Sequence, residues 1–204
     1  MTISDAQGTL VITRAQIVLG EIELKRTSAA ECPNHSGSGD DDCAEIEAGP
    51  LLVDVPVGGG FSATVAVAVP AGTYRELELE IEDADDDEVA GVAFLDANPA
   101  FREVSIRVEG TYNGQPFVFT SALEAEHEIE FATPLVVGSD GLDITINVDL
   151  SSWFRTPGGA LLDPVTANVG GRNADLVTRN IIDSFDAFED DDHDGRNDHG
   201  SGDS

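Results

Sequence analysis

Apolar and polar side chains alternate over most of the first three quarters of the chain, which is the period of a strand that buries one face. Leu77, Leu79 and Ile81, for example, are separated by single glutamates. Asn113-Gly114 stands between two such segments and predicts a tight hairpin turn, because both residues tolerate positive φ. The alternating segments are residues 9–14, 16–25, 51–55, 61–69, 77–81, 104–108, 117–119, 123–131 and 142–150. Together they predict an antiparallel β-sandwich.

Two segments have helical rather than strand periodicity. Residues 87–97 carry apolar side chains at roughly helical spacing and predict one short helix. Residues 173–188 place Leu176, Val177, Ile181, Phe185 and Phe188 on one stripe and predict a second, C-terminal helix. The side chains expected to fill the core between the last strand and this helix are Trp153, Phe154 and Leu162. We therefore expect a single domain over residues 1–188 and an acidic tail over 189–204.

The chain of 204 residues is extremely acidic, with a formal net charge of −30. Such a charge repels nucleic acid and favours cations, basic partners or mineral surfaces. Lys25 is the only lysine. This composition fits a protein from a saline habitat, where salt screens the repulsion between carboxylates, but a GC-rich genome would bias the composition in the same way.

The tail contains the pattern D-x-D-x-D-G-x-x-D, which begins at Asp190. Calcium takes six to eight oxygen ligands from a sharply turning loop. The candidate ligands are Asp190, Asp192, Asp194, the Arg196 carbonyl and Asp198. A complete EF-hand would have glutamate where Ser201 stands, so the loop instead resembles those of thrombospondin type 3 repeats and dockerins. The alternative is an acidic tail that only increases solubility.

Cys32 and Cys43 enclose a polar loop. A disulfide across it would contribute about 3 kcal/mol and would require an oxidising compartment. Free thiols are one alternative. A zinc site with His35 is another, although the sequence supplies no obvious fourth ligand.

Two runs of alternating glutamates are expected on exposed strand faces. The first comprises Glu76, Glu78, Glu80 and Glu82, and the second Glu124, Glu126, Glu128 and Glu130. Like charges directly opposite each other destabilise a sheet. The runs should therefore lie on different sheets, face basic residues such as Lys25 and Arg107, or bind cations. They could also serve only as a solvated face that blocks aggregation. The acidic segments 40–42 and 83–88 are candidates for further calcium sites.

The sequence gives little support for an enzyme. It contains neither a G-x-S-x-G elbow nor a phosphate-binding G-x-x-x-x-G-K. His127 falls at an inward position, where a lone histidine usually belongs to the core. No segment is long and apolar enough for a membrane span. Residues 1–5 lack the features of a signal peptide, so an exported form would have lost its signal.

Residues 70–74, Pro-Ala-Gly-Thr-Tyr, follow an apolar strand and precede the alternating Leu77, Leu79 and Ile81. Together with the early strands, this layout over residues 8–168 resembles a family of uncharacterised bacterial surface lipoproteins. The resemblance implies a prealbumin-like or immunoglobulin-like sandwich and an extracellular or cell-surface location. It implies no activity.

The sequence thus predicts a secreted or surface-exposed structural or adhesive β-sandwich with calcium as its ligand. Copies of the chain could assemble into filaments through calcium bridges and by donation of residues 1–14 as a strand. One alternative is a carbohydrate-binding module with a glycan partner, which would need Tyr74, Tyr112 and Trp153 to converge on one exposed face. Another is a salt-adapted acidic domain without a specific metal site.

Overall fold

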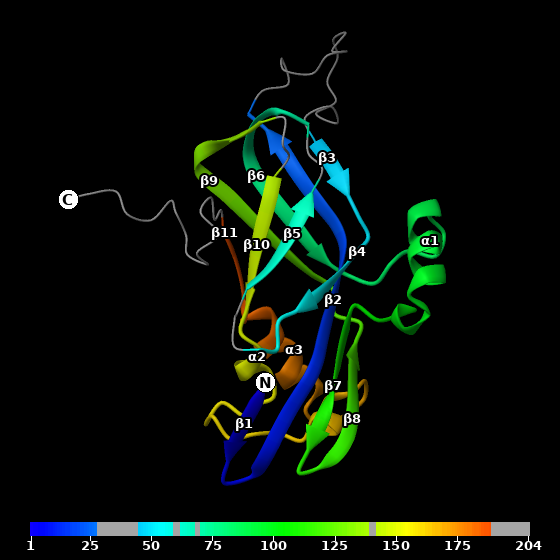
Figure 1. Cartoon of the computed structure of the whole chain (residues 1–204), viewed down its shortest axis with the longest axis vertical. Coiled ribbons are helices and arrows are strands. Elements are labelled where there is room, and N and C mark those ends of the chain that lie inside the picture. The colour runs from blue at the N-terminus through cyan, green and yellow to red at the C-terminus, as the bar shows by residue number, and fades with distance from the viewer. Residues whose placement is uncertain (28–44, 59–61, 68–69, 139–141, 189–204) are drawn as a thin grey trace, which may run out of the picture.

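A computed structural model describes residues 1–27, 45–58, 62–67, 70–138 and 142–188, which consist mainly of antiparallel strands (Figure 1). The strands are β1 (Thr2–Asp5), β2 (Gly8–Arg26), β3 (Glu45–Ala48), β4 (Leu51–Val55), β5 (Ser62–Val67), β6 (Gly72–Ile81), β7 (Ile106–Tyr112), β8 (Gln115–Ser121), β9 (Ala125–Val137), β10 (Leu142–Val148) and β11 (Phe185–Phe188). The helices are α1 (Val89–Ala97), α2 (Leu150–Trp153) and α3 (Ala174–Ile182), with short 3-10 turns η3 (Pro99–Phe101) and η4 (Pro164–Ala167).

The long strand β2 is the spine of the larger sheet. Along one side it pairs with β7 and then β6, and along the other with β1, β4 and β3. The strand order is β8-β7-β2-β6-β9, and the sheet curls like half of a barrel. A bulge between Leu19 and Glu21 shifts the register between β2 and β6.

The main core lies against the inner face of this sheet. Its largest fully buried side chains include Trp153, Tyr74, Phe119 and Phe154. Val148 of β10 and Val177 of α3 belong to the same cluster, so the second sheet, β11-β10-β5, and α3 close the sandwich. The prediction that side chains after the last long strand fill the core is confirmed. Trp153 and Phe154 are buried, and Leu162 packs against the same cluster.

A second, smaller cluster covers the outer face of β2. Val18 packs there with Phe94 and Leu95 of α1 and with Phe101 of η3. Residues 15–19 are therefore buried on both faces of the strand, which explains why their apolar run lacks clean alternation. Helix α1 and the η3 turn thus cover the middle of the outer face of β2. Arg14 and Gln16 lie on one side of this covered part, and Glu21, Glu23 and Lys25 lie on the other.

The predicted fold class is confirmed: the described residues form an antiparallel, mainly β sandwich with one short helix and a later helix. The later helix was predicted too long. It ends at Ile182, and the backbone of 185–188 pairs with β10 instead, because strand pairing satisfies its hydrogen bonds. Residues 1–14 were expected to be free for donation as a strand to another copy, which requires that they lie outside the core. They belong to it instead, since Leu10 and Ile12 are buried and β1 forms a hairpin with β2.

Several predicted features lie outside the described residues. They are the calcium-loop residues Asp190, Asp192, Asp194, Arg196 and Asp198, the cysteine pair Cys32 and Cys43, and the acidic segment 40–42.

Candidate cation-binding face

The two runs of glutamates lie directly opposite each other in one sheet. Strand β6 pairs with β9 so that Glu76 opposes Glu130, Glu78 opposes Glu128 and Glu80 opposes Glu126. Of the three arrangements expected for the runs, separation onto different sheets is therefore wrong, which leaves basic neighbours or bound cations. The apolar side chains on the other face explain this register, since Leu77, Leu79 and Ile81 are at most 3% exposed. A shift by one residue would move them into water and the glutamates into the core.

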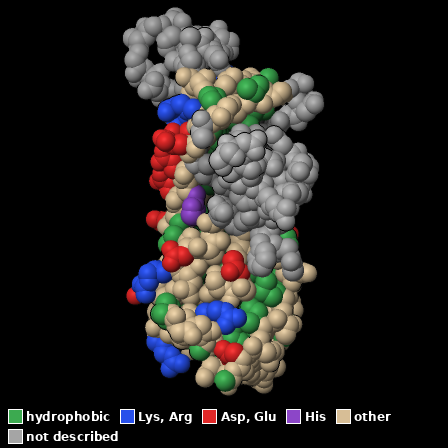
Figure 2. Space-filling model, turned by 90° about the vertical axis from the view of Figure 1, so that its left-hand side faces the viewer, with side chains coloured by type: hydrophobic (Ala, Val, Ile, Leu, Met, Phe, Trp, Pro, Cys, Tyr) green, Lys and Arg blue, Asp and Glu red, His purple; other side chains and the backbone are tan. Residues whose placement is uncertain are grey.

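Strand β2 adds a third row on the other side of β6. Glu21 opposes Glu80, Glu23 opposes Glu78, and Lys25 opposes Glu76. We call these nine positions of β2, β6 and β9 the glutamate face; they are Glu21, Glu23, Lys25, Glu76, Glu78, Glu80, Glu126, Glu128 and Glu130. Figure 2 shows acidic side chains gathered in a patch on the upper half of the molecule. Eight carboxylates and one ammonium group leave this surface strongly negative.

Lys25 forms the main ion pairs of the glutamate face. Its Nζ lies 2.6 Å from Glu76 Oε1 and 2.9 Å from Glu78 Oε2. These two carboxylates hold the pKa of Lys25 well above its ordinary value, by hydrogen bonding and by charge. Arg107, the other basic neighbour predicted from the sequence, is not part of this face. It pairs with Glu109 of β7 instead.

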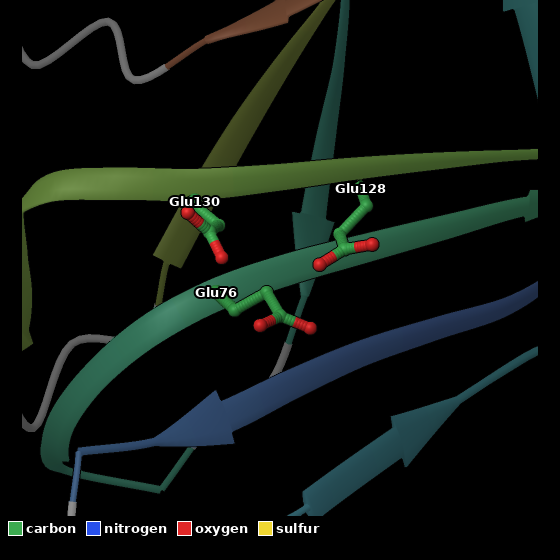
Figure 3. Close-up of side chains that lie close together, drawn as sticks. All are labelled: Glu76, Glu128 and Glu130. Carbon is green, nitrogen blue, oxygen red and sulfur yellow. The ribbon is translucent and has the colours of Figure 1, made fainter.

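Two trios of carboxylates on this face are close enough to share a cation. Glu76, Glu128 and Glu130 offer oxygens that all lie within 4.8 Å of one another, and so do Glu78, Glu80 and Glu126. Figure 3 shows the first trio, with Glu76 extending from β6 and the other two from β9. Calcium–oxygen distances are about 2.3–2.6 Å, so two ligands of one ion lie at most about 5 Å apart. Both trios satisfy this limit and would leave further coordination positions to water.

Repulsion within the glutamate face affects its protonation. The negative charge of Glu78 is the main cause that raises the pKa of Glu126, and Glu80 and Glu128 add to it. At the end of β6, burial first and then the charges of Glu80 and Asp83 raise the pKa of Glu82. Both carboxyl groups therefore take up a proton more readily than an ordinary carboxyl does, as expected where negative charges crowd together.

We expect Glu126→Gln to raise the melting temperature at pH 7. The folded-state pKa of Glu126 lies above its unfolded value, so repulsion weakens folding above that pKa and is relieved as the pH falls. The advantage of the variant should therefore shrink on acidification and vanish by about pH 4. Thermal unfolding of both proteins between pH 4 and 7 measures this difference. A constant advantage across the range would show that charge is not its cause.

An acidic hollow of about 540 Å³ adjoins the glutamate face near Gly20. Its lining contains five carboxylates, from Glu21, Glu82, Asp83, Asp85 and Glu88, and no basic side chain. The predicted 83–88 cluster therefore contributes to this hollow. Asp85, Asp86 and Asp87 also form a third trio, but all three are exposed, and Asp86 is paired with Arg102 at 3.1 Å.

Other sequence-predicted positions have structural roles. Tyr74 and Trp153 are fully buried, so the exposed aromatic trio expected for a carbohydrate-binding module does not form. The Tyr74 hydroxyl donates to the Pro70 carbonyl at 2.8 Å and closes the turn between them. His127 lies inward as predicted, with its ring 5.5 Å from that of Phe185, and burial lowers its pKa. Among the described residues, no helix is long and apolar enough to cross a membrane.

Sequence reasoning found two rows of the glutamate face but missed Glu21 and Glu23. The signal was present, because both residues occupy the polar positions of an alternating strand that ends at Lys25. The missing information was that this strand pairs with β6. Comparison with protein-family models, curated proteins and solved structures finds no match to this chain.

Proposed function

We propose that the protein binds calcium through the glutamate face and acts as a structural or adhesive protein outside the cell. The observation that carries the proposal is the direct opposition of glutamates on β6 and β9, with two trios of carboxylates within reach of one ion. Side-by-side carboxylates destabilise a sheet unless a cation lies between them. Lys25 supplies one such cation, which lies beside Glu76 and Glu78.

Calcium fits this donor set better than most ions. All the donors are carboxylate oxygens, which hard cations prefer, and calcium tolerates irregular coordination better than magnesium does. Each trio lies on a sheet surface rather than in a closed loop, so water would complete the coordination sphere. We therefore expect affinities of about 10⁻⁴–10⁻³ M, the range of extracellular calcium modules.

The extracellular role rests on sequence features and on ion supply. Millimolar calcium sites would be filled only where calcium is abundant, as it is outside cells. The resemblance to surface lipoproteins and the cysteine pair point to the same location. Because Glu126, Glu128 and Glu130 are exposed on an outer strand, an ion bound there would retain positions open to carboxylates of a second copy. Calcium bridging of this kind is how we propose that copies adhere.

The test is thermal unfolding of metal-stripped protein with and without calcium at constant ionic strength. Calcium at tenfold excess over its dissociation constant should stabilise the protein by about 1.4 kcal/mol per site. For a chain of this size, that corresponds to a rise of about 3–6 °C in melting temperature. Sodium chloride at matched ionic strength should not reproduce the rise. An equal effect of sodium would instead favour a salt-adapted acidic surface without a specific site.

Three double variants locate the response. Glu128→Gln/Glu130→Gln removes two ligands from the glutamate face, whereas Asp192→Asn/Asp194→Asn alters the candidate calcium loop in the tail. Asp96→Asn/Glu103→Gln is the control, because it removes two exposed acidic charges from outside the face. We expect the calcium-dependent shift to fall in the first variant and to persist in the control. A shift lost only in the tail variant would assign calcium to the tail and contradict a site on the face.

A further inference from the structure

A second hollow, of about 240 Å³, lies at the opposite end of the outer face of β2. Arg14 and Gln16 of β2, Arg107 and Glu109 of β7, and the η3 segment line it. The strand register places Gln16 directly between Arg107 on one side and Asp54 of β4 on the other. The hollow is thus built from three strands and the segment that covers them. It shares no lining residue with the glutamate face.

Gln16 is the unusual member of this lining. It is only 2% exposed, and its Nε2 has no hydrogen-bond partner among the described residues. A buried amide that lacks a partner is costly, and buried polar groups nearly always find one in folded proteins. Its neighbour Val18 occupies the next outward position and packs into the small apolar cluster. An apolar side chain at position 16 would continue that cluster, so the amide requires another explanation.

The charges around Gln16 are of both signs. The Arg107 guanidinium donates one N–H group to Glu109 at 2.6 Å, and Arg14 lies 3.5 Å from Asp54. A guanidinium has five donors, and a carboxylate accepts up to about four hydrogen bonds, so these pairs retain capacity for a ligand. The strongest ligand for an amide N–H beside a guanidinium is a carboxylate. On the other side of the hollow, the negative charge of Glu109 would attract an ammonium group and repel a carboxylate.

We propose that this hollow binds a small zwitterion with a carboxylate and an ammonium group on the same carbon atom, as in an α-amino acid. The carboxylate would accept from Gln16 Nε2 and Arg107, and the ammonium would donate to Glu109. Leu52, Pro99 and Phe101 supply an apolar wall for a short side chain. The volume limits the ligand to the size of a small amino acid. A ligand without net charge also escapes the repulsion that a chain of net charge −30 exerts on anions. This inference is independent of calcium binding.

The experiment compares three probes of one shape by NMR. L-valine carries both charges, isovalerate retains the carboxylate alone, and isobutylamine retains the ammonium alone. We expect valine to shift the Gln16 side-chain amide resonances and to bind about tenfold or more tightly than either analogue, as lost charged hydrogen bonds predict. Gln16→Leu and Arg107→Gln should each weaken valine binding by about the same factor. Arg172→Gln is the matched control, because it removes an exposed arginine outside the hollow.

Three results would overturn the proposal. The first is absence of valine binding up to about 50 mM, which would mean that any binding is weaker than millimolar. The second is isovalerate binding as tightly as valine, which would exclude an ammonium subsite. The third is undiminished valine binding by a folded Gln16→Leu protein. If a variant fails to fold, as judged by circular dichroism, the three probes with the unaltered protein still decide.

Discussion

Replacing Trp153 with alanine should lower the free energy of unfolding by about 3–5 kcal/mol. This loss is a large part of the 5–15 kcal/mol that stabilises a typical domain. Trp153 is fully buried at the end of α2, and its Nε1 donates to Ser184 Oγ at 2.7 Å. Its carbonyl accepts from Asn180 of α3 at 2.9 Å. The side chain thereby joins the segment after β10 to the junction of α3 and β11. Its removal leaves a cavity and takes away the N–H donor of the Ser184 hydroxyl, which keeps only its bond to the Ile181 carbonyl.

Urea unfolding followed by far-ultraviolet circular dichroism measures this effect. Fluorescence is unsuitable because Trp153 is the only tryptophan. Trp153→Phe retains most of the ring but loses the hydrogen bond, so it should cost less than the alanine variant. Val169→Ala is the control, since that side chain is 84% exposed and its truncation should change stability by less than about 0.5 kcal/mol. A loss below about 1 kcal/mol for Trp153→Ala would contradict the central position of this side chain in the core.

Local patterns in the sequence predicted the features that depend on neighbouring residues. The inward positions of Leu77, Leu79 and Ile81 follow from alternation alone, and the structure buries all three. The hairpin at Asn113 and Gly114 is also confirmed, with φ angles of 51° and 77°. Such features could be predicted because strand period and turn conformation are set within a few residues.

The pairing of strands could not be predicted in the same way. Strands β6 and β9 lie far apart in sequence, and repulsion between their glutamates argued against pairing. The buried faces decided the outcome, because hydrophobic burial of several side chains outweighs the repulsion between the glutamates, which Lys25 partly compensates at Glu76 and Glu78. The same dependence on distant strand partners explains why the helix α3 is shorter than predicted. Phe185 and Phe188 fit a helical stripe, but their segment gains a strand partner in β10 that no local pattern indicated.

Some of the candidate functional residues could likewise be predicted from local patterns, and others depend on distant contacts. The outward positions of Glu76 to Glu82 and of Glu124 to Glu130 were predictable, whereas the third row from β2 was not. Nothing in the sequence distinguishes Gln16, because a glutamine in an alternating strand is ordinary. Only the cover of α1 and η3 over β2 makes it a buried amide without a partner.

Replacing Lys25 with methionine should cost about 3 kcal/mol at neutral pH, close to the effect of breaking a buried ion pair. The Lys25 side chain is 22% exposed, and its partners Glu76 and Glu78 are only 5% and 13% exposed. Methionine retains much of the apolar stem but removes the charge, so two poorly hydrated carboxylates remain without their main counter-ion. Chemical denaturation of the variant and the unaltered protein, in the absence of calcium, measures the difference.

Arg75→Gln provides a matched control, because Arg75 also contacts Glu76. That contact is 3.7 Å long, and the arginine side chain is 56% exposed, so the loss should remain below about 1 kcal/mol. The double variant Lys25→Met/Glu76→Gln should regain much of the lost stability, since it removes the carboxylate that was left without compensation. Equal losses for Lys25→Met and Arg75→Gln would mean that charge number, rather than the buried geometry, determines the effect.

The Lys25 variant also connects stability to the proposed function. If carboxylates on the glutamate face require a cation, removal of the one ammonium group should make the protein more dependent on calcium. The calcium-induced rise in melting temperature should then be larger in Lys25→Met than in the unaltered protein, because the ion replaces a missing charge as well as relieving repulsion. Arg75→Gln should leave the rise unchanged. A rise that is equal or smaller in Lys25→Met would place calcium away from Glu76 and Glu78, and would argue that Lys25 alone stabilises this surface.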